Sequence, residues 1–252
     1  MNPARTILAT ALAAVLAAGA ISFFAPVHAK APAPRADASL HSYILLDRTG
    51  SMEPIWKEAV SSVNAYAEGL ASLDGGPQVN ADITLAVFDS QDGFQFDVVR
   101  ESVDATRWRK LTDADATPRG MTPLYDAIGR IVSLAEKDRP EKAVIVIMTD
   151  GEENSSEEMT KTSAKAALDR ARAKGWEVVF LGAEFSNFDD AEGVGQSSSR
   201  NMAVSKDQLS DSMNRLAQKS RGYATGAAPS VEWNAEDRSA AKEEEVKQRN
   251  GN

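Results

Sequence analysis

Apolar and polar residues alternate along this chain in blocks of two different periods, which predicts strands and helices in turn. Short apolar or alternating runs bounded by turn-forming residues predict strands at 42–46, 82–88, 95–103, 143–148, 176–181 and 201–204. Apolar residues at helical spacing predict helices at 54–73, 123–138, 160–174 and 207–221. Pro54 suits the first turn of its helix, and Gly75-Gly76 marks a stop.

The order of these elements predicts an α/β fold with three layers. Strands alternate with helices, and residues 143–148 are apolar on both faces, as expected of a central parallel strand that helices cover. Residues 89–93 join two strand-like runs with the composition of a hairpin, so one strand should be antiparallel at the edge. Sites in such sheets lie beyond the carboxyl ends of the strands.

The two ends of the chain differ from its body. The 21 residues from Ile7 to Val27 are uncharged, and Val27-His28-Ala29 has the small-residue pattern of a secretory cleavage site. We therefore expect residues 1–29 to be a signal peptide, with an uncleaved membrane anchor as the alternative. Residues 30–39 predict a Pro- and Ala-rich linker, and 226–252 a disordered charged tail or a frayed helix. This predicts an exported protein, periplasmic or secreted, or tethered if the anchor persists.

Composition excludes several classes of function. The chain has 252 residues and no cysteine, which excludes disulfides, thiolate zinc sites and a cysteine nucleophile. Its net charge of -9 gives no basic surface for a phosphate backbone, so nucleic acid is not an expected partner. Cleavage after residue 29 would leave His41 as the only histidine, which leaves a serine hydrolase without a suitable base.

Three polar segments stand at strand ends or before a helix. Asp47, Thr49 and Ser51 follow the first strand on alternate residues, Thr122 precedes a helix-starting proline, and Asp150 follows the most apolar strand. Each alone is explained as a helix cap or a turn residue. Together they should meet at one sheet edge, where hydroxyl and carboxylate oxygens suit Mg²⁺, Mn²⁺ or Ca²⁺.

This pattern resembles the metal-ion-dependent adhesion site of von Willebrand factor type A domains, which reads D-x-S-x-S, then a lone Thr, then a lone Asp. The resemblance covers about Ser39 to Thr225, and RGMTPLYDAIGR, VIMTDGEENSS and GWEVVFLGA resemble the small stand-alone bacterial members. It implies a Rossmann-like domain over 40–225. The metal ligands it implies are Asp47, Thr49, Ser51, Thr122 and Asp150. Thr49 stands where the strict pattern has Ser; it keeps the hydroxyl and adds a methyl that stiffens its rotamer.

The resemblance implies a protein-binding module rather than an enzyme. In the family the two acids act largely through bound water, so the ion keeps an open position that a Glu or Asp of a partner protein fills. Mg²⁺ is the expected ion, with Mn²⁺ or Ca²⁺ as alternatives, and the sequence does not identify the partner. Two other functions stay open: an exported scaffold with a structural metal site, and a metal-dependent hydrolase using Asp150 or Glu152 as base.

Four further acids stand close to these motifs. Glu152 and Glu153 follow Asp150 and are expected to be charges on the rim of the site. Asp126 and Asp89 are expected to bond neighbouring loops rather than the ion.

Overall fold

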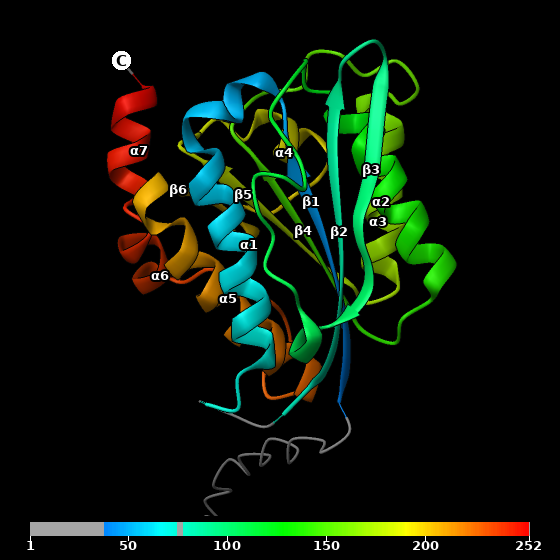
Figure 1. Ribbon diagram of the computed structural model, residues 1–252, viewed down its shortest axis with the longest axis vertical. Helices are drawn as coiled ribbons and strands as arrows, with labels where there is room; N and C mark the ends of the chain where they lie inside the picture. Colours follow the sequence, from blue (N-terminus) through cyan, green and yellow to red (C-terminus); the bar gives the residue numbers. More distant parts are fainter. Residues whose placement is uncertain (1–37, 75–77, 252) are drawn as a thin grey trace, which may run out of the picture. The chain divides into compact units, whose positions relative to one another are not determined.

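A six-stranded sheet with strand order β3-β2-β1-β4-β5-β6 forms the centre of the computed structural model (Figure 1). The strands are β1 (Ser39–Asp47), β2 (Asn80–Ser90), β3 (Phe94–Asp104), β4 (Ala143–Thr149), β5 (Glu177–Ala183) and β6 (Asn201–Val204). Neighbouring strands are parallel except β2 and β3, which are antiparallel. This confirms the predicted mostly parallel sheet with one antiparallel edge strand.

The structure describes residues 38–74 and 78–251. The expected signal peptide, most of the expected linker and the Gly75-Gly76 stop lie outside the described residues. Within the described ranges, no helix is both long and apolar enough to cross a membrane.

Helices cover both faces of the sheet. They are α1 (Trp56–Ala71), α2 (Leu124–Asp138), α3 (Lys161–Ala173), α4 (Asp189–Gly193), α5 (Leu209–Thr225), α6 (Ala235–Ala240) and α7 (Glu243–Asn250). One apolar cluster joins the sheet to α1 and α5, and a second joins it to α2 and α3. In β4, Val146 belongs to the first cluster and Ile147 to the second, as expected of a strand buried on both faces. The three-layer α/β fold is confirmed. Pro54 belongs to a 3-10 helix (Gly50–Ile55) that precedes α1.

The sheet register places the predicted site. Asp47, the last residue of β1, pairs with Phe88 of β2, and Leu46 pairs with Met148 of β4. Because β1 and β4 are adjacent and parallel, the residues that follow them leave the sheet side by side.

The C-terminal residues form the short helices α6 and α7 and pack on the domain, whereas the sequence predicted a disordered tail or a frayed helix. Val231, Trp233 and Val246 are buried. The backbone N–H of Ala203 in β6 donates to Glu243 Oε1 at 3.3 Å, so the tail covers the outer edge of the sheet (Figure 1). The prediction failed because these apolar residues are scattered and give no periodic pattern; each docks onto a surface that the rest of the chain has formed.

Candidate metal centre

The five predicted ligands lie at the carboxyl ends of β1 and β4. Asp47 ends β1, Thr49 directly precedes the 3-10 helix, Ser51 lies in the first turn of that helix, and Asp150 directly follows β4. Thr122 comes from the loop that precedes α2. Residues separated by about a hundred positions therefore meet because two parallel strands are neighbours.

Asp47 is completely buried at the carboxyl end of β1. Its Oδ1 accepts a hydrogen bond from the backbone N–H of Thr49 at 2.7 Å, and its Oδ2 accepts one from the Thr149 hydroxyl at 2.6 Å. Burial raises the pKa of Asp47 to about 7, because loss of hydration outweighs these hydrogen bonds. The buried Asp47 carboxylate is therefore stabilised by either a proton or a cation that neutralises its charge.

The other four candidate ligands bring their side-chain oxygen atoms close together. Thr49 Oγ1 lies 3.1 Å from Ser51 Oγ, and Ser51 Oγ donates to Asp150 Oδ1 at 2.8 Å. A Cβ added to Gly151 would lie 3.8 Å from both Ser51 Oγ and Thr122 Oγ1, so these two hydroxyls border the same small space. Burial also raises the pKa of Asp150.

These donors fit a hard divalent cation. Three hydroxyls and two carboxylates converge, and all are oxygen ligands of the kind that Mg²⁺, Mn²⁺ and Ca²⁺ accept. In the described part of the chain, no three His, Cys, Asp or Glu side chains are grouped to hold a metal. An ion at this edge would therefore depend on the hydroxyls as well as on the acids.

Backbone hydrogen bonds fix the loop that carries Thr122. Its N–H donates to Asn154 Oδ1 at 2.9 Å, and its carbonyl accepts from Asn154 N–H at 3.0 Å. Gly50 N–H donates to the Gly120 carbonyl at 3.1 Å, and Met121 exchanges backbone hydrogen bonds with Ser90. The three segments that supply ligands are thus joined through main-chain atoms.

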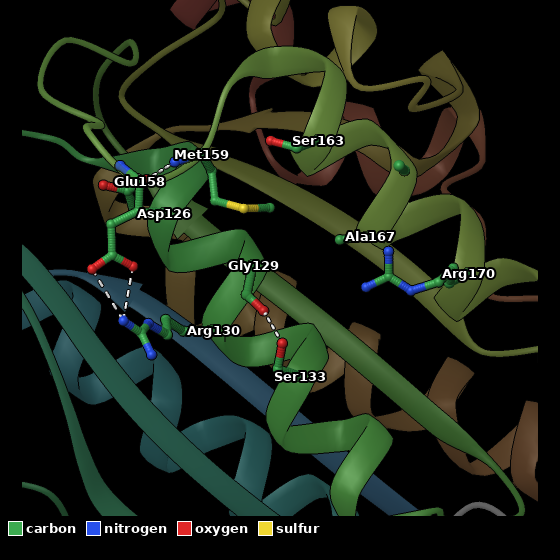
Figure 2. A pocket seen from close by; sticks show the side chains of 10 residues that line it. Asp126, Gly129, Arg130, Ser133, Glu158, Met159, Ser163, Ala167 and Arg170 are labelled. Atoms are coloured by element: carbon green, nitrogen blue, oxygen red, sulfur yellow. Dashed lines mark hydrogen bonds and ion pairs between the residues drawn. The ribbon is translucent and has the colours of Figure 1, made fainter.

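Asp126 bonds the neighbouring loop, as predicted. It is buried at the start of α2, and its carboxylate accepts the backbone N–H groups of Glu157, Glu158 and Met159 at 2.9, 3.0 and 2.6 Å. Figure 2 shows Asp126 beside this loop, with Arg130 of α2 facing Glu158 in an ion pair of 2.8 Å. These contacts position the segment that follows Asp150.

Glu153 differs from its predicted role as a rim charge. It accepts backbone N–H groups from Tyr125 at 2.9 Å and from Ser155 and Ser156 at 2.9 and 2.7 Å, so it organises the loop. Glu152 is exposed at the rim and accepts a hydrogen bond from Asn187.

Asp89 supports the site through a residue that the sequence analysis missed. Arg48 is buried, and its Nε lies 2.5 Å from the fully buried Asp89, while Arg119 Nε lies 3.3 Å from the same carboxylate. Arg48 N–H also donates to the Phe88 carbonyl, and Arg48 O accepts from Arg119 N–H. The only sign of this role in the sequence was the position of Arg48, a basic residue between Asp47 and Thr49.

Residues 43–221 match the von Willebrand factor type A domain. The chain belongs to this family. No curated protein is significantly similar to it in sequence. Because the match spans most of the chain, the family assignment predicted from the motifs is confirmed.

Solved structures share the fold at low sequence identity. The pilus adhesin SpaC from Lactobacillus rhamnosus GG has a TM-score of 0.59 and 14% identity over 75% of this chain and 31% of the adhesin. The vWF domain of the type V pili tip protein Mfa5 from Porphyromonas gingivalis has a TM-score of 0.56 and 10% identity over 72% of this chain and 95% of that domain. Proximal thread matrix protein 1 from the mussel byssus, with a zinc-occupied MIDAS motif, has a TM-score of 0.53 and 15% identity over 75% of this chain and 47% of the matrix protein. The chain spans less than half of the adhesin and of the matrix protein.

Proposed function

We propose that this chain is a metal-dependent protein-binding module. In this proposal a divalent cation held by the five ligands captures an acidic side chain of a partner protein. The observation that carries it is the buried Asp47, next to Asp150 and three converging hydroxyls, with no basic side chain among the described residues in contact with either acid. Mg²⁺ is the proposed ion, with Mn²⁺ or Ca²⁺ as alternatives.

The exposure of the site supports an ion with one coordination position open to a partner protein. Asp47 is buried, whereas Ser51 is exposed and Asp150 half-buried, so the site opens outward on one side. When bound, the ion would supply a Lewis-acidic position for a carboxylate. The names of the structural neighbours, two from pili and one from a byssus thread matrix, agree with binding outside the cell. Export to the periplasm or the medium is part of the proposal.

Binding explains the site better than catalysis does. His41, the histidine in the described residues, is buried near the start of β1, with Nε2 2.8 Å from Thr84 Oγ1, while the ligands lie beyond the opposite end of that strand. A hydrolase would thus have to use Asp150 or Glu152 as its base, and Asp150 already accepts the Ser51 hydroxyl.

The test compares Thr122→Ala with Thr122→Ser. Because Thr122 is anchored through its main chain, Ala should leave the fold intact and remove one oxygen ligand, while Ser should retain binding. We expect Mn²⁺ titration to show weaker binding for Ala than for Ser. Affinity capture from the native extracytoplasmic extract should yield a partner only with metal-loaded wild type or Ser. The same partner held in chelator, or by Ala, would instead favour the scaffold function.

A further inference from the structure

A cleft of about 300 Å³ opens beside the proposed ion. It is lined by Ser51, Pro54, Ile55, Asp150, Ala183, Glu184 and Lys206. Two of these residues are proposed ligands, so the cleft begins at the metal and continues toward the ends of β5 and β6. One carboxylate bound to the ion would occupy only its inner end and leave room for a second side chain.

Lys206 gives this cleft an uncompensated positive charge. The neighbouring Glu184 is paired with Arg249 at 2.8 Å, and it accepts the Ser205 hydroxyl and the backbone N–H of Lys206 but not the Lys206 ammonium. Asp207 is paired with Lys242 at 2.6 Å. Within residues 38–74 and 78–251 the exposed Lys206 ammonium makes no ion pair, so it is available to a ligand.

An exposed methionine flanks the ion on the other side. Met121 immediately precedes Thr122 and is 55% exposed, although it is a large apolar residue. Its backbone pairs with Ser90 at the end of β2, whereas Lys206 follows β6, so the two residues lie on opposite sides of β1 and β4 in the sheet order. A flexible thioether on an anchored backbone is a suitable contact for an apolar partner residue.

The geometry points to a partner segment with three features: the acid that binds the ion, a second carboxylate that meets Lys206, and an apolar side chain that covers Met121. This inference rests on the proposed function. Asp47 and Asp150 balance the charge of a divalent ion, so a partner with two acids brings two negative charges, of which Lys206 offsets one. The segment is therefore acidic, with an apolar residue on the side away from the cleft.

The experiment selects random peptides displayed on phage against the intact chain in Mn²⁺, with elution by chelator. Wild type should enrich peptides with two acidic positions and one apolar position. Peptides selected on Lys206→Glu should keep the first acid but carry Lys or Arg in place of the second. Peptides selected on Met121→Ser should show no preference for an apolar residue. A synthetic peptide of the wild-type consensus should bind Lys206→Glu at least about fivefold more weakly.

Matched control variants separate effects at the proposed contact residues from effects of any surface substitution of the same kind. Lys137→Glu reverses an exposed lysine in the last turn of α2, and Leu73→Ser removes a side chain that is 70% exposed beyond α1. Both should bind Mn²⁺ and the peptide like wild type, and peptide binding by Lys206→Glu and Met121→Ser is compared with them at a Mn²⁺ concentration that saturates each variant. If no peptide elutes with chelator, the proposed function fails and this inference with it. If eluted peptides need a single acid and bind Lys206→Glu and Lys137→Glu equally, the function stands and this inference is overturned.

Discussion

Gly120→Ala should damage the site because two structural demands coincide at this residue. Gly120 has a φ of 69°, in the left-handed region that disfavours alanine. A Cβ there would also lie 2.6 Å from the carbonyl oxygen of Ser90 and 2.9 Å from the backbone nitrogen of Gln91. These are main-chain atoms, so no rotamer change relieves the contact and the loop itself has to move.

The control for this prediction is Gly175→Ala. Gly175 has a similar φ of 80°, but nothing lies within 4 Å of its added Cβ. The left-handed conformation alone costs alanine about 1–2 kcal/mol, which is the loss of unfolding free energy expected for Gly175→Ala. A main-chain overlap adds about 1–3 kcal/mol, so Gly120→Ala should lose about 2–5 kcal/mol.

Urea unfolding and Mn²⁺ titration measure the two effects separately. A shift of Gly120 moves Met121 and Thr122, so we expect Gly120→Ala to weaken Mn²⁺ binding. Gly175 lies between α3 and β5, at the opposite end of the sheet, so its variant should bind Mn²⁺ like wild type. Equal stability losses in the two variants, or unchanged Mn²⁺ affinity in Gly120→Ala, would refute the role assigned to this close contact.

Three further predictions test the supporting structure. Asp126→Ala leaves three backbone N–H groups without their acceptor and should lower the free energy of unfolding in urea by about 3 kcal/mol or more; a loss below about 1 kcal/mol would contradict this. The pKa of Asp47 is raised from 3.8 to about 7, so the folded metal-free protein holds a proton that the unfolded chain has lost. Its stability in chelator should therefore fall as pH rises between these values, Mn²⁺ affinity should rise toward the upper value, and Asp47→Asn should flatten the stability trend. Trp233→Ala should cost about 3–5 kcal/mol in urea unfolding because this side chain is buried, whereas a disordered tail would show no change.

The strands and helices of the body were predictable because each buries a whole face and therefore repeats its apolar residues regularly. The limits of the elements were less predictable. Polar residues at 39 and 41 end the apolar run of the first strand, yet β1 begins at Ser39, because His41 is buried and hydrogen-bonded to Thr84. A polar residue satisfied by a neighbouring strand looks like a loop residue when only the sequence is read.

The convergence of the five candidate ligands could be predicted because they occupy fixed positions relative to strand ends, and strand order brings those ends together. The roles of Arg48 and Glu153 could not. Each depends on a partner from a distant segment, Asp89 for Arg48 and the N–H of Tyr125 for Glu153, and no local pattern marks such a pairing.

The buried acids of the described residues show why this edge favours a cation. Four are neutralised by a basic side chain: Asp89 by Arg48, Glu177 by Arg200, Asp237 by Lys219 and Glu243 by Arg238. Asp126 accepts three backbone N–H groups. Asp47 is bonded by one backbone N–H and by the hydroxyls of Thr149 and Thr49, which carry no charge, and the neighbouring Asp150 raises its pKa further, so its negative charge is poorly compensated. A divalent ion at this position would supply the missing positive charge, which is why the deficit is better explained as part of a binding site than as a packing defect.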